Sequence, residues 1–157
     1  MNLHLQDQAV LVFASSGGIG RGVATEFARE GAKVMLFARS EDKLAATAEA
    51  IAAETGNRPL YTVGDLTDAA SVQGVIDRTV AEFGGLWALF NNTGGPPAGG
   101  FDSFDDAAWQ SAFELTVLGY VRAIRAALPH LRTGGGGRIV NNTSVSTTPR
   151  SIDQDDS

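Results

Sequence analysis

Cysteine is absent from the 157-residue sequence, which excludes disulfides, thiolate zinc ligands and thiol nucleophiles. The chain also lacks a basic excess: 12 lysines and arginines stand against 18 acidic residues, a formal net charge of −6, which argues against nucleic-acid binding. No apolar run reaches the roughly 18 residues of a membrane span, and no signal peptide is visible at the N-terminus. We therefore expect a cytoplasmic protein with neither a nucleic-acid nor a membrane partner.

The apolar residues that are present alternate between two patterns. Short continuous apolar runs are typical of parallel strands buried on both faces, and segments with helical periodicity separate them. The predicted strands cover residues 9–13, 33–38, 59–63, 86–90 and 138–142. The predicted helices include residues 20–30, 68–83 and 105–131, and a further helix follows Ser40, which we expect to cap it. This order predicts an α/β fold with right-handed crossovers and helices on both faces of a parallel sheet.

A glycine-rich turn joins the first predicted strand to the first helix, with the sequence Ala-Ser-Ser-Gly-Gly-Ile-Gly over residues 14–20. Backbone N–H groups in such a turn can approach a pyrophosphate at the N-terminus of a helix. The position after the first strand makes this interpretation stronger than the glycine pattern alone would. A tight turn without a ligand is the alternative.

Motifs follow at the ends of other predicted strands. Asp65-Leu66 follows the third strand, Asn91-Asn92-Thr93-Gly94 follows the fourth, and Gly137-Arg138-Ile139-Val140-Asn141 leads to Ser144. With the turn at residues 14–20, these motifs resemble the short-chain dehydrogenase/reductase family, in particular its 3-oxoacyl-(acyl-carrier-protein)-reductase-like members, over residues 5 to 145. The turn matches T-G-x-x-x-G-x-G, with Ala14 in place of the first glycine, so we expect tighter clearance for a ligand there.

The resemblance implies a three-layer Rossmann-type, doubly wound sheet with strand order 3-2-1-4-5, truncated relative to the full family fold. We predict this domain over residues 1–146 and a polar tail over residues 147–157. The implied cofactor contacts are Ala14, Ser15, Ser16, Gly18, Ile19, Gly20, Arg39, Asp65, Leu66, Asn92, Thr93 and Gly94. Ser144 stands at the place of the family's catalytic serine, which orients the substrate carbonyl.

The end of the second predicted strand indicates the form of the cofactor. An acidic residue at the position of Ala38 would bind the ribose 2′-hydroxyl of NAD, and none is present. Arg39 offers a planar cationic fork that suits a 2′-phosphate. We therefore predict NADP(H) in preference to NAD(H). A solvated surface arginine is the alternative.

The family's catalytic pattern is incomplete. Its Tyr-x-x-x-Lys pair has no counterpart, since Asp65 and Ile124 stand four residues after Tyr61 and Tyr120, and Thr116 aligns with the relay asparagine. Two hypotheses remain: an NADP(H)-dependent carbonyl/alcohol oxidoreductase of small molecules, truncated and inactive alone, or a catalytically silent dinucleotide-binding or interaction module. Hydrolysis by Ser144 is disfavoured because no base is evident. A bare helix face beside the fifth strand predicts a homo-oligomer.

Overall fold

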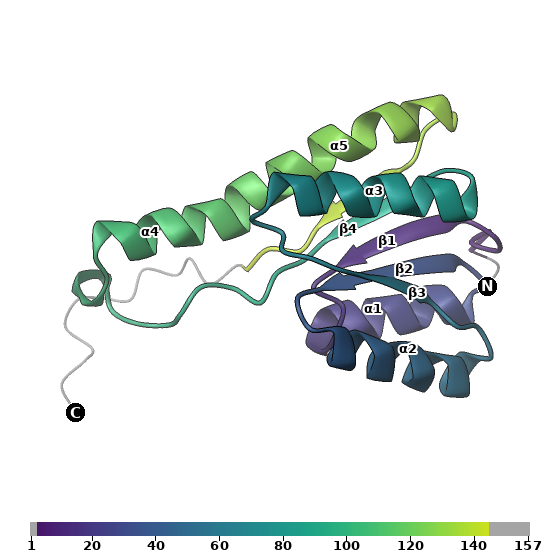
Figure 1. Cartoon of the computed structure of the whole chain (residues 1–157), viewed down its shortest axis with the longest axis horizontal. Coiled ribbons are helices and arrows are strands. Elements are labelled where there is room, and N and C mark those ends of the chain that lie inside the picture. The colour runs from purple at the N-terminus through teal and green to yellow at the C-terminus, as the bar shows by residue number, and fades with distance from the viewer. Residues whose placement is uncertain (1–2, 145–157) are drawn as a thin grey trace.

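A parallel five-stranded sheet forms the centre of the protein, in a computed structural model that describes residues 3–144 (Figure 1). The strand order is β3-β2-β1-β4-β5, which confirms the predicted order. The strands are β1 (Ala9–Phe13), β2 (Lys33–Ala38), β3 (Leu60–Val63), β4 (Ala88–Asn91) and β5 (Arg138–Asn141). The predicted domain boundary at residue 146 and the predicted tail lie outside the described residues.

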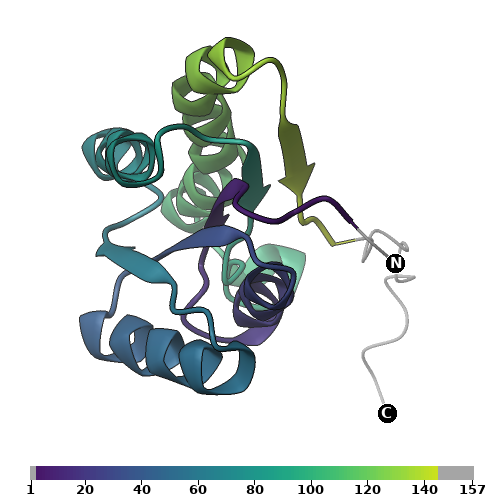
Figure 2. The same cartoon turned by 90° about the vertical axis from the view of Figure 1, so that its right-hand side faces the viewer.

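Helices cover the sheet from both sides and make three layers (Figures 1 and 2). Helices α1 (Gly18–Arg29) and α2 (Glu41–Thr55) cover one face, and α3 (Ala69–Phe83) and α5 (Gly119–Thr133) cover the other. The remaining elements are the 3₁₀ turn η1 (Phe101–Ser103), α4 (Asp106–Phe113) and the π-helical turn η2 (Glu114–Leu118). No helix within residues 3–144 combines the length and the apolarity needed to cross a membrane.

The core is densest around β1, because this central strand has a helical layer on each side. All five of its residues are buried, as its continuous apolar run predicts. The strand shares its two faces between separate clusters: Leu11 and Phe13 pack towards α3 and α5, and Val10 and Val12 pack towards α1 and α2. The strand therefore holds its carboxyl end, where the glycine turn begins, in a fixed place.

Helix α5 shares a core cluster with α3, and most of its buried residues are small. Gly119, Ala123 and Ala127 are buried, and a Cβ at Gly119 would stand 2.9 Å from Cγ of Leu66. The small side chains of the long helical segment therefore face the core. Of its aromatic side chains, Trp109 and Phe113 are exposed, whereas Tyr120 is buried in the core.

The structure corrects the sequence prediction at two helices. The single helix expected over residues 105–131 is interrupted by the π turn η2, where the Thr116 hydroxyl donates to the Ala112 carbonyl oxygen at 2.7 Å and competes for the regular helical acceptor. Ser40 precedes α2 but makes no capping bond with its side chain. The side chains of Asp68 and Asp105 do accept such bonds, at the starts of α3 and α4.

Candidate functional site

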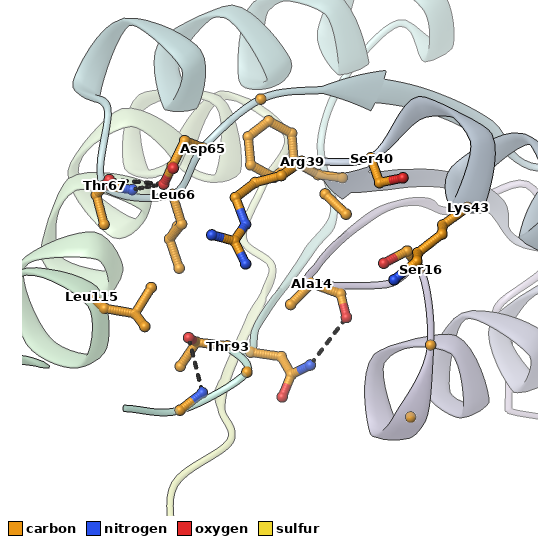
Figure 3. Close-up of a pocket in the computed structure, with 18 of the residues that line it drawn as sticks. Ala14, Ser16, Arg39, Ser40, Lys43, Asp65, Leu66, Thr67, Thr93 and Leu115 are labelled. Atoms are coloured by element: carbon orange, nitrogen blue, oxygen red, sulfur yellow. Dashed lines mark hydrogen bonds between the residues drawn. The ribbon is translucent and has the colours of Figure 1, made fainter. Parts of the chain in front are cut away.

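An open crevice of about 980 Å³ runs along the carboxyl edge of the sheet (Figure 3). Ten of the twelve residues predicted to contact a cofactor line it: Ala14, Ser16, Gly18, Ile19, Arg39, Asp65, Leu66, Asn92, Thr93 and Gly94. These residues come from the ends of four strands and from the N-terminus of α1. Parallel strands bring their carboxyl ends to one edge, and this is where open α/β sheets bind ligands.

The two other predicted residues lie beneath the crevice and fix the glycine turn. Ser15 is buried, and its Oγ accepts a hydrogen bond of 2.9 Å from the backbone N–H of Phe37 in β2. Gly20 is also buried, and a Cβ there would stand 2.4 Å from the Ala14 carbonyl oxygen. Only glycine therefore allows α1 to begin this close to the end of β1.

Ala14 occupies a backbone conformation that suits glycine. Its φ of 47° lies in the left-handed region, where an L side chain costs about 1–2 kcal/mol. The family pattern has glycine at this position. The alanine at this position therefore strains the backbone.

The turn leaves open space beside the first residues of α1. A Cβ built at Gly17 or Gly18 would meet no atom within 4 Å. Gly17 is the N-cap residue of α1 and brings no side chain to the exposed amide groups, and no acidic residue stands in the first turn. Such a helix N-terminus favours an anionic group.

Arg39 and Asp65 lie on the opposite wall, where the guanidinium of Arg39 extends into the crevice past Leu66 (Figure 3). The Asp65 carboxylate accepts bonds from the backbone N–H of Thr67 at 2.8 Å and from its hydroxyl at 2.7 Å. These two bonds hold the pKa of Asp65 below its usual value, and the positive charge of Arg39 acts in the same direction. Asp65 is therefore a fixed negative charge at neutral pH.

Asparagine side chains bind the strand ends together at the base of the crevice. The Asn142 amide donates to Oδ1 of Asn92 at 2.8 Å, and the Asn92 amide donates to the Ala14 carbonyl oxygen at 3.4 Å. The Tyr120 hydroxyl donates to the Asn142 carbonyl oxygen at 2.9 Å, and burial raises the pKa of this tyrosine. These bonds join β1, β4, β5 and α5, so the end of each strand is positioned by the others.

The structure adds wall residues that the sequence reasoning missed. Lys43 lies beside Ser16 and Ser40 in the first turns of α2 (Figure 3), and Ser111 and Leu115 come from α4 and η2. Asn142 also lines the crevice. In the sequence, Lys43 is recognisable only as a positively charged residue about one helical turn after the end of the second strand. No local sequence pattern predicts the part of the crevice wall formed by α4, because its position depends on how the helix crosses the sheet.

Ser144 lies three residues beyond the end of β5 and is exposed, and within residues 3–144 it is not among those that line the crevice. Thr116, at the position of the relay asparagine, is half-buried and donates its hydroxyl to its own helix. Most of the residues predicted to contact a cofactor are thus brought together at one edge of the sheet. The described residues bring no proton-donating tyrosine into the crevice.

A doubly wound sheet, a glycine turn at the first helix and a crevice at the carboxyl edge together define a dinucleotide-binding α/β domain. Residues 8–154 match the family model described as "short chain dehydrogenase". The chain belongs to the short chain dehydrogenase family.

Solved structures and curated relatives give the scale of the similarity. L-sorbose reductase from Gluconobacter frateurii, complexed with NADPH and L-sorbose, superposes with a TM-score of 0.87 at 33% identity, over 92% of this chain and 55% of that one. A short chain dehydrogenase from Burkholderia cenocepacia in complex with NADP gives 0.84 at 33% identity, over 94% and 60%. Cis-4-hydroxycyclohexanecarboxylate dehydrogenase of Sinomonas cyclohexanicum is 32% identical over 88% of this chain and 55% of its own length. The chain spans about half the length of the curated relatives it matches.

Proposed function

We propose that this chain is the cofactor-binding part of an NADP(H)-dependent short-chain oxidoreductase that interconverts small carbonyl compounds and alcohols. The observation that carries the proposal is the cation in the crevice at the end of β2. Arg39 extends into it, and Ala38 stands where an acidic residue would favour NAD. Lys43 adds a second positive charge to the lining of the crevice, beside Ser16 and Ser40. Two cations in the crevice, and no acid at the position of Ala38, favour a ligand with a 2′-phosphate.

The crevice suits a dinucleotide along its length. The open backbone at Gly17 and Gly18 would take the pyrophosphate, Asp65 and Leu66 would contact the adenine, and Asn92 to Gly94 would contact the part nearer the nicotinamide. A bound nicotinamide supplies or accepts the hydride. The residues of this chain bind and orient it, and Ser144 is proposed to orient the substrate carbonyl.

Two neighbours support the cofactor, since their solved structures contain NADPH or NADP. L-sorbose in one of these structures is a small carbonyl compound, in line with the proposed substrate class. The 3-oxoacyl-thioester subtype rests on the sequence motifs alone. We place the protein in the cytoplasm on the sequence argument.

Calorimetric titration with NADPH and NADH, followed in parallel by the emission of Trp87 and Trp109, tests the cofactor assignment. We expect micromolar binding of NADPH, about −8 kcal/mol. Arg39→Ala should weaken NADPH binding about 10- to 100-fold, because a charge-assisted hydrogen bond contributes about 1.5–3 kcal/mol, and should leave NADH binding unchanged. Arg58→Ala is the matched control, since Arg58 pairs with Glu49 and does not line the crevice. Equal losses for both cofactors in Arg39→Ala contradict the preference.

A catalytically silent dinucleotide-binding module is the second candidate. It is favoured by the threonine at the relay position. The discriminating assay is NADPH consumption with a panel of 3-oxoacyl thioesters and simple ketones. Turnover that Ser144→Ala abolishes supports the oxidoreductase.

A further inference from the structure

The loop between β3 and α3 forms one end of the crevice wall. Asp65, Leu66 and Thr67 in this loop all line the crevice. The Asp65 carboxylate accepts two hydrogen bonds from Thr67, and the Gly64 N–H donates to the Ala38 carbonyl oxygen of β2 at 3.0 Å. These bonds set the local shape of the loop and the place where it leaves the sheet. Its position relative to the helices must come from contacts outside the loop.

Helix α5 supplies such contacts through two residues that lie one turn apart. Gly119 leaves room for Leu66, since a Cβ at residue 119 would stand 2.9 Å from Cγ of Leu66. One turn later, the guanidinium of Arg122 donates to the Thr67 carbonyl oxygen at 3.1 Å. Residues three apart on a helix share a face. The first turn of α5 therefore holds both Leu66 and Thr67 in place.

The same guanidinium also contacts a second part of the wall. Nη1 of Arg122 lies 2.8 Å from Oε2 of Glu114 in η2. Leu115, the next residue, lines the crevice, and Figure 3 shows it at the same end as Leu66 and Thr67. Arg122 itself is not among the residues described as lining the crevice. Arg122 therefore joins the loop after β3 to the turn η2 without forming part of the crevice surface.

This ion pair is less exposed than the other four ion pairs of the described residues. The side chains of Arg122 and Glu114 are exposed to 27% and 34%, whereas every side chain in the other pairs is exposed to 43% or more. Water and salt screen a partly buried pair less than a surface pair. An Nη atom carries two hydrogens, so one nitrogen can donate to both Glu114 and Thr67. We call these two contacts the Arg122 bridge.

We propose that Arg122 is a positioning residue for the adenine end of the crevice. The Arg122 bridge sets the distance between the loop after β3 and Leu115, and the affinity for the adenine half of the cofactor depends on that distance. This inference rests on the proposed function, which assigns the adenine to this loop. Because Arg122 acts through Thr67 and Glu114, its loss should leave the nicotinamide end of the site unchanged.

Calorimetric titration of Arg122→Met with NADPH and with 2′,5′-ADP, the adenine half of NADPH, tests this role. We expect both ligands to bind about tenfold more weakly, because the charge-assisted bond to Thr67 is lost and only the adenine end changes. Arg125→Met is the matched control and should bind both ligands like the wild type. Arg125 lies on the next turn of α5, is exposed and forms no ion pair among the described residues. Unchanged affinities in Arg122→Met, or a loss confined to NADPH, overturn the proposal.

Two further variants separate a positioning role from a general folding defect. Glu114→Ala leaves the bond to Thr67 in place and should weaken 2′,5′-ADP binding by only about threefold. Adding Arg122→Met to Glu114→Ala should cost less than Arg122→Met costs alone, because the two side chains act as one unit. Arg122→Lys keeps the charge and three N–H donors, so it should restore part of the affinity that Arg122→Met loses. Losses that add in the double variant, or a lysine variant as weak as the methionine variant, contradict the bridge.

Hydrogen–deuterium exchange without ligand keeps a failure of the bridge distinguishable from a failure of the proposed function. Arg122→Met should speed exchange of the amides at residues 65–69, because the loop loses a contact with α5, and should leave the buried strand β1 unchanged. Unchanged exchange at residues 65–69 overturns the bridge, whichever ligands bind. If the wild-type protein binds neither NADPH nor 2′,5′-ADP, the proposed function fails and the adenine role fails with it, while the exchange data still decide the bridge.

Discussion

Strands β1 and β5 belong to the same parallel sheet, yet every residue of β1 is buried and no residue of β5 is. The two strands differ in the number of helical layers that cover their faces. Helices pack on both faces of β1, whereas α5 packs on one face of β5 and the described residues place no helix on the other (Figure 2). The protein therefore has a packed body, formed by β1 to β4 with α1, α2, α3 and α5, and a sparsely packed region, formed by η1, α4, η2 and β5. The body holds most of the predicted cofactor contacts, and the second region supplies one wall of the crevice.

The largest expected effect is on the free energy of unfolding, and it is measured by shortening one side chain in each of the two regions. Leu89→Ala in β4 should lower the free energy of unfolding by about 2–5 kcal/mol, because Leu89 is fully buried in the core. Val140→Ala in β5 should change it by at most about 0.5 kcal/mol, because Val140 is half exposed. Urea unfolding measures both. Similar losses for the two variants would show that β5 is packed as tightly as the body.

A smaller effect is expected in the glycine turn of the body. Gly20→Ala should cost about 1–3 kcal/mol and abolish NADPH binding, because the new Cβ would overlap the Ala14 carbonyl oxygen. The matched control is Gly22→Ala in the same helix, where a Cβ meets nothing within 4 Å and alanine should stabilise α1. Thermal unfolding and calorimetric titration measure the pair. Tight NADPH binding by Gly20→Ala would contradict the close approach of α1 to β1.

Tyr120 is where the sparsely packed region is anchored to the body. Tyr120→Phe removes the hydrogen bond to the Asn142 carbonyl oxygen and should cost about 1 kcal/mol. Tyr61→Phe is the control, since its hydroxyl makes no hydrogen bond among the described residues, and it should cost much less. Urea unfolding measures the free energy of unfolding of the two variants. Equal costs would mean that the bond does not hold β5 in place.

Ala14→Gly should act in the opposite direction. Glycine relieves the left-handed strain at φ 47° and loses some chain entropy, so we expect a net gain of about 0.5–1 kcal/mol and tighter NADPH binding. Ala46→Gly in the exposed interior of α2 should instead cost about 1 kcal/mol. A destabilised Ala14→Gly would show that the backbone at this turn is not strained.

The smallest effect concerns pH at the edge of the crevice. The pKa of Asp65 is lowered in the folded state by the bonds from Thr67, so its contribution to stability is complete above the unfolded value, about 3.9, and is lost as the pH falls through the folded value. Asp65→Asn should therefore lose less stability than the wild type on acidification from pH 5 to pH 2. Asp42→Asn, at a carboxylate that accepts no hydrogen bond among the described residues, should follow the wild type. Melting temperatures across this range measure the difference.

The sequence predicts the packed body better than the sparsely packed region, and the reason is physical. A parallel strand buried on both faces needs a continuous apolar run, so residues 9–13 and 33–38 are recognisable without a structure. The glycine turn is recognisable because its steric demand is local. The π turn at residues 114–118 and the crevice wall at Leu115 depend on how one helix crosses the sheet, and no local pattern encodes that crossing.

The same reasoning explains which site residues were missed. Arg39 follows directly from the end of a strand, whereas Lys43 reaches the crevice only because α2 begins beside the glycine turn (Figure 3). The contact between Asn142 and Asn92 depends on the parallel register that brings β5 alongside β4. Spacing along the chain carries no information about such cross-strand neighbours.

Hydrogen–deuterium exchange with and without NADPH tests the central claim, that the crevice at the carboxyl edge is an NADP(H) site. Without cofactor, the amides of β1 should exchange slowly because every residue of this strand is buried. The amides of α4 should exchange fast because this helix contains no buried residue. With NADPH, new protection should fall on residues 14–20, 64–67 and 92–95, and on the wall at residues 111–115. Protection away from these segments, or none under conditions where calorimetry shows saturation, would contradict the account.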